Sequence, residues 1–433
     1  MNKKILAVAV ASMFAAPAAF AQSSVTISGY MKVGLDSFKI TSPVAARAGM
    51  NTSENRITDH SSRILFNVVE DLGGGLQAIA QYDLRVSGDA VNRTSNTLAS
   101  GQTQTSTPSI NTLNAGNNHV GLRSAQWGSI RFGRQDTHYG NAGDTIATKA
   151  GHLGAFNSSV FDSVQRPGGT SGVGASSNQT IANQSRTPNL VWYDSPKWGG
   201  FGFMVGYSSN PIRTSTTPEY ENDLSSGNRK GRMWTFNPVY NGGNWEVAWS
   251  HWNAKSDWSG CPATQVGFAT SQGCLNPQDD QKADSVRGHY IFPMGLRLGL
   301  AWNHSKTIGS PWLASGAVNT FSGRATGDRK AWAIPVSYNT GAHTFYLTHT
   351  KAGDSKATGV TGANTGAKLT SLAYNYDLSK RTSAALTYVR LKNESNASYN
   401  TFFTGDSALG GTNSTANVGE GQRLMGFTLR HNF

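Results

Sequence analysis

Short segments in which apolar and polar side chains alternate recur along almost the whole chain. Residues 201–207 place two phenylalanines, a valine and a tyrosine on one face of an extended backbone, and two glycines and a methionine on the other. Residues 296–302 likewise separate three leucines and a tryptophan from Arg297, Gly299 and Ala301. A period of two residues is typical of β-strands with two different faces, whereas amphipathic helices have a period of 3.6. The pattern therefore predicts an all-β protein.

Sixteen such segments follow one another, joined by connections of two alternating kinds. The predicted strands cover residues 25–36, 61–71, 75–87, 118–125, 128–135, 188–196, 201–209, 230–241, 243–253, 284–293, 295–306, 329–340, 342–352, 368–378, 381–393 and 421–433. Short connections with Gly, Asn, Asp or Pro alternate with long ones rich in Ser, Thr, Asn and Gly, such as 37–59 and 307–328. This combination is typical of outer-membrane barrels. We therefore expect a 16-stranded antiparallel transmembrane β-barrel with short periplasmic turns and long outer loops.

The composition is also that of a barrel in contact with lipid. Of the 433 residues, 37% are hydrophobic and 14% are charged, both below the roughly 45–50% and about 25% of soluble domains. The low charged fraction argues against a soluble α/β enzyme, and an aromatic fraction of 10% argues against a disordered chain. In a barrel, only the lipid-facing half of each strand must be apolar, and the closed sheet satisfies every backbone amide.

The N-terminus has the three parts of a secretory signal peptide. Two lysines form a short positive region, residues 5–14 are apolar, and Ala-Phe-Ala at 19–21 is an A-x-A cleavage site. We therefore expect residues 1–21 to be removed, which leaves residues 22–433 as the barrel domain. No later stretch has 18 consecutive apolar residues, so the exported protein is expected to be periplasmic, secreted or an outer-membrane barrel.

Few residues suggest catalytic or cofactor chemistry. Export permits a disulfide between Cys261 and Cys274, but two cysteines without nearby histidines do not make up a metal site. The chain has no Gly-x-Ser-x-Gly or His-Glu-x-x-His pattern, and its ten histidines are scattered. The formal net charge of +12 is spread over strands and loops, unlike a nucleic-acid-binding surface. We expect no enzyme activity, no cofactor or metal, and no nucleic-acid partner.

A barrel of this size encloses water, so its function depends on the residues that line the interior. The longest connection, residues 136–187, follows the fifth predicted strand. A loop of this length is unusual without a function, and its length fits both a loop folded into the channel and a flap outside it. Its carboxylates Asp144 and Asp162 are candidates for the acidic side of a constriction.

Alternation directs several basic side chains into the channel from strands that are neighbours in an antiparallel meander. They are Lys32, Arg63, Arg85, Arg123 and Arg131. Facing carboxylates of the long loop, they would set up a field across the channel that favours anions. Arg134 falls on the outward face beside Ile130 and Phe132, so either it reaches the membrane interface or the chain leaves the sheet there.

Six segments carry a similarity that goes beyond alternation. They are SVTISGYMKVGL at 24–35, SRILFNVVEDLGGGLQAIAQY at 62–82, FGRQ at 132–135, YDSP at 193–196, YDLSKRT at 376–382 and LRHNF at 429–433. Together they resemble strands and hairpins of the Gram-negative general porins, in particular the neisserial and β-proteobacterial type. The similarity extends over the whole chain after the signal peptide.

The resemblance implies a homotrimer of sixteen-stranded barrels that allow passive diffusion of small hydrophilic solutes. It also implies that the loop 136–187 folds inside the channel and that arginines face its carboxylates. Arg63 and Arg134 stand at the positions of the family's arginines, which favours an inward Arg134. Phe433 resembles the C-terminal assembly signal of outer-membrane barrels.

Two positions depart from the pattern of the family. Trp192 stands where the family often has an arginine, and Lys32 stands where an acidic residue is common. The acidic motif of the long loop is not clearly reproduced either. Asp162 and Asp144 are therefore candidates chosen by position in the loop.

We therefore expect an outer-membrane diffusion channel that prefers anions. Its expected partners are further copies of the chain in a homotrimer, outer-membrane lipid, small hydrophilic solutes and anions. The loop residues Arg213, Arg229, Lys230 and Arg232 are candidates for contacts with lipopolysaccharide phosphates. The alternatives are a substrate-specific outer-membrane channel, a barrel enzyme and a soluble secreted β-protein.

Overall fold

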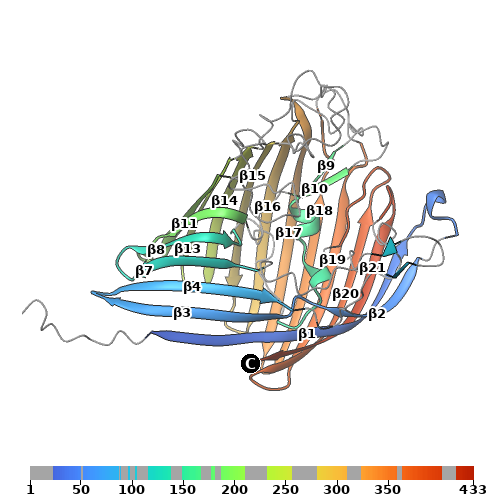
Figure 1. Cartoon of the computed structure of the whole chain (residues 1–433). Helices are drawn as coiled ribbons and strands as arrows, with labels where there is room; N and C mark the ends of the chain where they lie inside the picture. The colour runs from blue at the N-terminus through green and yellow to red at the C-terminus, as the bar shows by residue number, and fades with distance from the viewer. Residues whose placement is uncertain are drawn as a thin grey trace, which may run out of the picture.

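One antiparallel sheet of seventeen strands closes on itself in the computed structural model of this protein (Figure 1). The strand β1 (Ser24–Thr41) forms the seam. It pairs with β21 (Gly421–Asn432) on one side and with β2 (Ser53–Asp59) and β3 (Arg63–Gly73) on the other. The structure describes residues 23–49, 52–86, 88, 96–97, 103–104, 116–137, 149–166, 177–180, 187–209, 232–255, 280–309, 323–357, 363–401 and 416–433.

The remaining strands of the sheet follow in chain order, and each is antiparallel to its neighbours. They are β4 (Leu76–Arg85), β7 (Asn118–Ser124), β8 (Gly128–Gln135), β11 (Thr187–Asp194), β12 (Phe201–Ser208), β13 (Arg232–Asn241), β14 (Trp245–Lys255), β15 (Asp280–Ile291), β16 (Leu296–Ile308), β17 (Ala325–Thr340), β18 (His343–Ala352), β19 (Ala367–Asp377) and β20 (Thr382–Asn393). Because β2 and β3 share one position beside β1, the barrel has sixteen strand positions. The predicted 16-stranded barrel is confirmed.

The two faces of the wall differ as the alternation predicted. In β19, Leu372 and Tyr376 are exposed on the outer face, whereas Ser371 and Asn375 are buried on the inner face. Large apolar side chains are exposed on the outer face of strands all around the sheet. This arrangement fits a lipid-facing wall around a polar interior.

Several strands extend beyond their predicted ends into the long connections. Residues 37–59 were expected to be a connection, yet β1 continues to Thr41 and β2 occupies Ser53–Asp59. Likewise, β17 begins at Ala325, inside the predicted connection 307–328. Their outward side chains are polar because these strand ends lie past the apolar band of the wall, so a search for an apolar outer face does not detect them.

An extra residue separates β2 from β3 where both pair with β1. Tyr30 pairs with Arg63 and Val33 pairs with Asp59, so two residues of β1 lie opposite three residues of the partner. Such a bulge moves every following side chain to the opposite face. Ile57 before the bulge is exposed on the outer face, whereas Arg63 after it lies on the inner face.

The side chain of Asp59 holds the bulge in place. One of its carboxylate oxygens accepts hydrogen bonds from the backbone N–H groups of Ser61 (2.8 Å) and Ser62 (3.0 Å). The hydroxyl of Ser62 in turn accepts a hydrogen bond from the N–H of Lys32 across the seam (2.9 Å). Ser61 has a φ of 70°, the left-handed conformation that a tight turn of this kind requires.

Helical structure is limited to single turns in the described part of the chain. These are η1 (Ala45–Arg47), η4 (Leu153–Ala155) and α2 (Ser158–Phe161). Among the described residues, no helix is long and apolar enough to cross a membrane. Two small hairpins also lie in long connections, β5 (Asn96–Thr97) with β6 (Thr103–Gln104), and β9 (Ser163–Arg166) with β10 (Ser177–Thr180).

Candidate functional site

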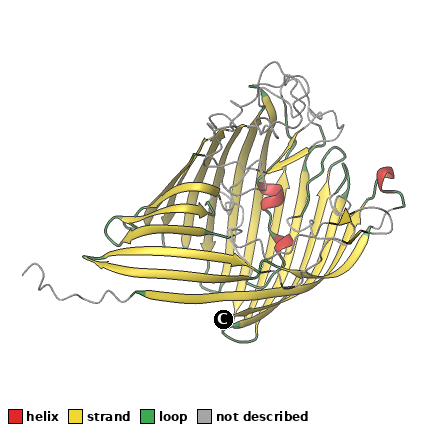
Figure 2. Ribbon diagram, viewed as in Figure 1, coloured by secondary structure: helices red, strands yellow, loops and turns green. Residues whose placement is uncertain are grey.

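The described part of the longest predicted connection, residues 149–166, lies against the inner face of the barrel wall. The hydroxyl of Ser371 donates a hydrogen bond to the carbonyl of Ala155 (3.0 Å), and the N–H of Ala150 donates to the side chain of Asn375 (3.1 Å). Both wall residues lie on the inner face of β19. Figure 2 shows the two helical turns of this segment, in red, beside the strands of the wall.

Small side chains of the wall leave room for α2. Val160 and Phe161 are fully buried and pack into a cluster with alanines of β16 to β19. Ala331, Ala333 and Ala352 belong to this cluster, and each is at most 1% exposed. Because alanine fills little of the interior, a helical turn fits closely against the inner wall at β17 to β19. The wall and the segment are therefore packed as one unit here.

A buried hydrogen bond joins the segment to the seam strand. Nε2 of His152 lies 2.6 Å from a carboxylate oxygen of Asp36, and both side chains are fully buried. Nδ1 of His152 accepts a hydrogen bond from the N–H of Gly154 (2.8 Å). A neutral imidazole has one N–H, so this contact assigns it to Nε2, which donates to Asp36.

Burial lowers the pKa of His152 to about 4. The hydrogen bond to Asp36 acts in the opposite direction, and the nearby His60 and Lys32 add to the lowering. The ring of His60 packs edge-on against that of His152, with centroids 4.1 Å apart. His152 is therefore neutral at neutral pH, which matches its role as a donor through one nitrogen and an acceptor through the other.

Asp36, His60 and His152 offer three possible metal-ligand atoms within 4.8 Å of one another. A metal ion bound at Nε2 of His152 would require the proton to lie on Nδ1. That position faces the N–H of Gly154, which is itself a donor. The observed contacts therefore favour a hydrogen-bonded anchor over a metal site.

Two predicted arginines face each other on the inner wall and share one carboxylate. Arg63 of β3 pairs with Arg85 of β4 in the sheet register. Their guanidinium groups lie 3.3 Å and 2.8 Å from the same oxygen of Asp83, which is only 1% exposed. The hydroxyl of Ser61 contacts both arginines. One negative charge between two positive ones leaves this part of the wall positively charged.

The positive charge continues across the seam of the barrel. Arg63 and Arg430 lie over the ring of Tyr30, at 5.0 Å and 4.0 Å from its centroid. Lys32 pairs with Arg430 in the register of β1 and β21 and is 4% exposed. We call Arg85, Arg63, Arg430 and Lys32 the basic strip; it crosses β4, β3, β1 and β21.

Arg430 is the residue of the strip that the sequence did not identify. Alternation in residues 421–433 already places it inward, in phase with Gly426 and Thr428. Only the pairing of the last strand with the first shows that it lies beside Tyr30. It also donates a hydrogen bond to the carbonyl of Lys149 (2.9 Å), so the strip contacts the internal segment directly.

The other predicted basic residues lie apart from the strip. Arg131 of β8 lies 3.5 Å from Asp194 of β11. Arg134 pairs with Asn118 in the sheet register. It is two positions from Phe132, which is exposed on the outer face, so alternation assigns both residues to that face. The register position of Arg134 agrees with alternation, and its inward orientation stays a prediction. Arg123 of β7 donates to Gln77 near a short turn (2.8 Å and 3.1 Å).

Asp162 is fully buried next to the inner wall at β16 and β17. The carbonyl of its neighbour Phe161 accepts a hydrogen bond from Arg329 of β17 (2.6 Å). The described contacts thus place Asp162 by β17, whereas the carboxylate that contacts the strip is Asp83. An acidic role of Asp162 in a constriction stays a prediction. Asp144, Cys261, Cys274 and the predicted signal peptide lie outside the described residues.

The last residue of the chain takes part in closure. The backbone of Phe433 exchanges two hydrogen bonds with Gly29 of β1 (3.1 Å and 3.2 Å). A Cβ atom at Gly29 would lie 2.3 Å from the carbonyl oxygen of Arg63 and 2.8 Å from the ring of Phe433. Glycine is therefore required where the first strand passes between its neighbours.

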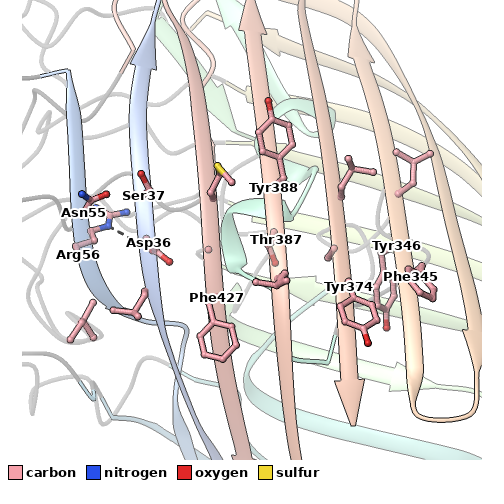
Figure 3. A pocket seen from close by; sticks show the side chains of 18 of the residues that line it. Asp36, Ser37, Asn55, Arg56, Phe345, Tyr346, Tyr374, Thr387, Tyr388 and Phe427 are labelled. Carbon is pink, nitrogen blue, oxygen red and sulfur yellow. Dashed lines mark ion pairs between the residues drawn. The ribbon is translucent and has the colours of Figure 1, made fainter. Parts of the chain in front are cut away.

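A large pocket lies on the outer face of the wall and is separate from the channel. Exposed apolar side chains of β17 to β21, β1 and β2 line it, among them Leu35, Leu372 and Phe427. Figure 3 shows Phe345, Tyr374 and Phe427, which lie on β18, β19 and β21 of this surface. The large apolar side chains of its lining are exposed on the outer face of the wall, so it faces the surroundings of the barrel.

Comparisons with known proteins agree on one family. The chain matches a family model described as Gram-negative porin over residues 7–396. It is 25% identical over 410 residues to an outer membrane porin protein of Bordetella pertussis, covering 88% of this chain and 92% of that protein. It is also 25% identical over 228 residues to the major outer membrane protein P.IB of Neisseria gonorrhoeae, covering 53% and 54%.

Solved structures share the fold over nearly the whole chain. The anion-selective porin from Comamonas acidovorans superposes with a TM-score of 0.61 at 20% identity, covering 95% of this chain and all of that one. The trimer form of OmpT of Vibrio cholerae superposes with a TM-score of 0.57 at 13% identity, covering 95% and 99%.

Proposed function

This chain belongs to the Gram-negative porin family, and on that premise we propose that the basic strip makes it an anion-preferring diffusion channel. As an outer-membrane porin it forms a water-filled channel through which small hydrophilic solutes diffuse passively. The members of this family are channels. What the proposal adds is the sign of the preferred solute charge and the residues that set it.

The basic strip is the observation that carries the proposal. It brings three arginines and Lys32 to one part of the inner wall, and the carboxylate of Asp83 neutralises only part of the arginine charge. Fixed positive charge in a narrow, low-dielectric passage raises the local concentration of anions and lowers that of cations. The relative from Comamonas acidovorans is described as anion-selective, which is consistent with this preference.

We further propose that the loop 136–187 narrows the channel opposite or beside the strip. The contacts of residues 149–166 with the inner wall support this role. Asp144 and Asp162 are its proposed acidic residues, and Arg131 and Arg134 are proposed secondary contributors to the basic side. The substrate-specific channel is the alternative for the same barrel.

The proposals on export and assembly are based on the similarity of this chain to other porins. We propose a homotrimer, which the trimer form of the Vibrio cholerae protein supports. Residues 1–21 act as a cleaved signal peptide, Phe433 acts in assembly, and Cys261 bonds to Cys274. Lipopolysaccharide is the proposed outer-leaflet partner, with Arg229, Lys230 and Arg232 among the loop residues that contact its phosphates.

Reversal potentials in a planar bilayer under a KCl gradient test the anion preference. The double variant Arg63→Gln/Arg430→Gln removes two charges of the strip, and we expect it to lose most of the chloride preference of the wild type. Arg123→Gln changes one inward charge near a short turn and is the control that should keep the preference. A wild-type channel that prefers cations, or a double variant with an unchanged reversal potential, would contradict the proposal.

A further inference from the structure

Basic side chains project outward at one level on five consecutive strands, β18 to β21 and β1. We call them the basic rim: Lys351, Lys368, Arg390, Lys392, Arg423 and Lys39. Each is an even number of residues along its strand from an exposed apolar residue of the outer face, such as Leu372, Leu386 or Leu35, and therefore points to the same side. The rim therefore faces the surroundings of the barrel and is separate from the basic strip inside it.

Like charges of the rim stand directly opposite one another in the sheet. Lys368 pairs with Lys351 on one side and with Lys392 on the other. Arg423 pairs with Arg390 on one side and with Lys39 on the other. Directly opposed like charges destabilise a sheet. An anion bound on this surface would remove that repulsion.

No acidic side chain compensates the rim within the described part of these strands. The outward positions of β18 to β21 and β1 contain no aspartate or glutamate. None of the six rim residues makes an ion pair with another described residue. Their charge is therefore available to a partner outside the barrel.

The rim lies one membrane thickness away from the short turns. Lys392 is ten residues from the start of β20 at Thr382, and Arg423 is nine residues from the end of β21 at Asn432. A tilted barrel strand crosses the hydrocarbon layer in about 9–11 residues. The rim thus stands at the polar edge of the outer leaflet, where lipid headgroups begin.

A hollow in the apolar surface lies directly below the rim. It is the pocket of Figure 3, with a volume of about 1090 Å³, and its lining includes Tyr388 and Met425. These two residues pair with each other, and each is two positions from a rim arginine on its own strand. The hollow is larger than the roughly 300–1,000 Å³ of typical small-molecule sites, which suits several acyl chains.

We propose that the rim and the hollow together bind one lipopolysaccharide molecule of the outer leaflet, with its phosphates on the rim and acyl chains in the hollow. This inference rests on the outer-membrane location and on the proposed lipopolysaccharide partnership, but not on the ion preference of the channel. Charge complementarity favours a phosphorylated lipid over a second copy of the chain. The outward carboxylates at this level, Asp280, Asp284 and Asp328, have partners of their own.

Binding of lipid A to the folded full-length protein in detergent tests the rim. The probes are bisphosphorylated lipid A and the same lipid without phosphates, measured by native mass spectrometry. The rim variant Lys351→Gln/Lys368→Gln/Lys392→Gln removes three charges and relieves two like-charge pairs, so folding should not suffer. Its matched control, Lys255→Gln/Lys282→Gln/Lys306→Gln, removes three outward charges at the same level of β14 to β16, away from the hollow.

We expect wild type and control to bind bisphosphorylated lipid A at least tenfold more tightly than the unphosphorylated lipid. The rim variant should lose at least tenfold in affinity for the phosphorylated form. Leu386→Trp, which fills the hollow, should weaken both lipids because it acts on the acyl chains. Conductance, measured in parallel, should persist in every variant, which separates this result from the test of ion preference.

Equal binding of the two lipids, or an unchanged affinity of the rim variant, would overturn the proposal. A rim variant that dissociates to monomers in lipid-free detergent, with lipid affinity intact, would instead identify the surface as a contact between subunits. Phosphatidylglycerol binding as tightly as lipid A at the rim would show a general anionic-lipid surface and overturn the specific assignment.

Discussion

The side chain of His152 holds the internal segment to the seam strand through one buried hydrogen bond to Asp36. Its pKa of about 4 lies below the ordinary value near 6.5, so the anchored state favours the neutral ring. The anchor is therefore at full strength above pH 6.5. The free energy by which the anchor stabilises the attached segment falls by about 1.4 kcal/mol for each pH unit as the pH decreases from 6.5 to 4.

This titration predicts acid-sensitive behaviour of the open channel. Protonation would place a hydrogen on Nδ1, which faces the N–H of Gly154, and the segment would detach from Asp36 more often. We expect current noise or closures in single-channel recordings to rise as the pH falls from 6.5 to 4. His152→Gln can still donate to Asp36 but does not titrate, so its recordings should depend much less on pH. Equal pH dependence in both proteins would contradict this role.

A substitution of Asp83 should change both the stability of the barrel and its ion preference. Replacing it by asparagine keeps the size of the side chain but leaves Arg63 and Arg85 without their shared counter-ion. Breaking a buried ion pair in this way costs about 3 kcal/mol. We expect Asp83→Asn to unfold at lower urea concentration and, where folded, to prefer chloride more strongly. Glu70→Gln is an exposed one-charge control in the same hairpin, and a similar effect there would argue against the explanation.

The orientation of a single side chain was predictable only where alternation along a strand decides which face of the wall it occupies. Lys32, Arg63 and Arg85 were assigned to the interior because each alternates with outward apolar neighbours, and the structure places them on the inner face. Arg430 and His152 depended on contacts between segments far apart in the chain. No local pattern in a sequence encodes such contacts.

At the scale of elements, the bulge between β2 and β3 decides which face Arg63 occupies. Deleting Ser61 would remove the extra residue and reverse the face of every residue on one side of it. We expect the deletion either to prevent folding, measured as loss of the heat-resistant band in gel electrophoresis, or to abolish the chloride preference. Ser61→Gly suits the φ of 70° and should leave both unchanged. A deletion variant that behaves like wild type would contradict this account.

Element boundaries were predictable where lipid imposes alternation and not beyond it. The segment β2 is almost entirely polar, and its strand form is determined by pairing with β1. The short helical turns of residues 153–161 were not predicted because they are stabilised by the wall against which they pack. The barrel itself was predictable because sixteen alternating segments with two kinds of connection fit few other folds.

At the scale of the whole molecule, the seam depends on a close approach at Gly29. A methyl group there would meet the carbonyl of Arg63 at 2.3 Å. We expect Gly29→Ala to lower the yield of folded barrel and its melting temperature in detergent, because β1 would be pushed away from one neighbour. Gly353→Ala should be tolerated, since a Cβ atom there would lie 3.4 Å from its nearest atom, a backbone oxygen. Equal yields for the two variants would contradict the prediction.

The anchors of the internal segment also have a consequence for the order of events during biogenesis. Ala155, Ala150 and His152 contact wall residues that are 216, 225 and 235 positions later in the chain. Contacts at such separations form late, because the intervening chain must first be ordered. The passage can therefore reach its final width only after the last strands have joined the first. A newly inserted barrel should pass through a brief, wide and poorly discriminating stage before it becomes a selective filter.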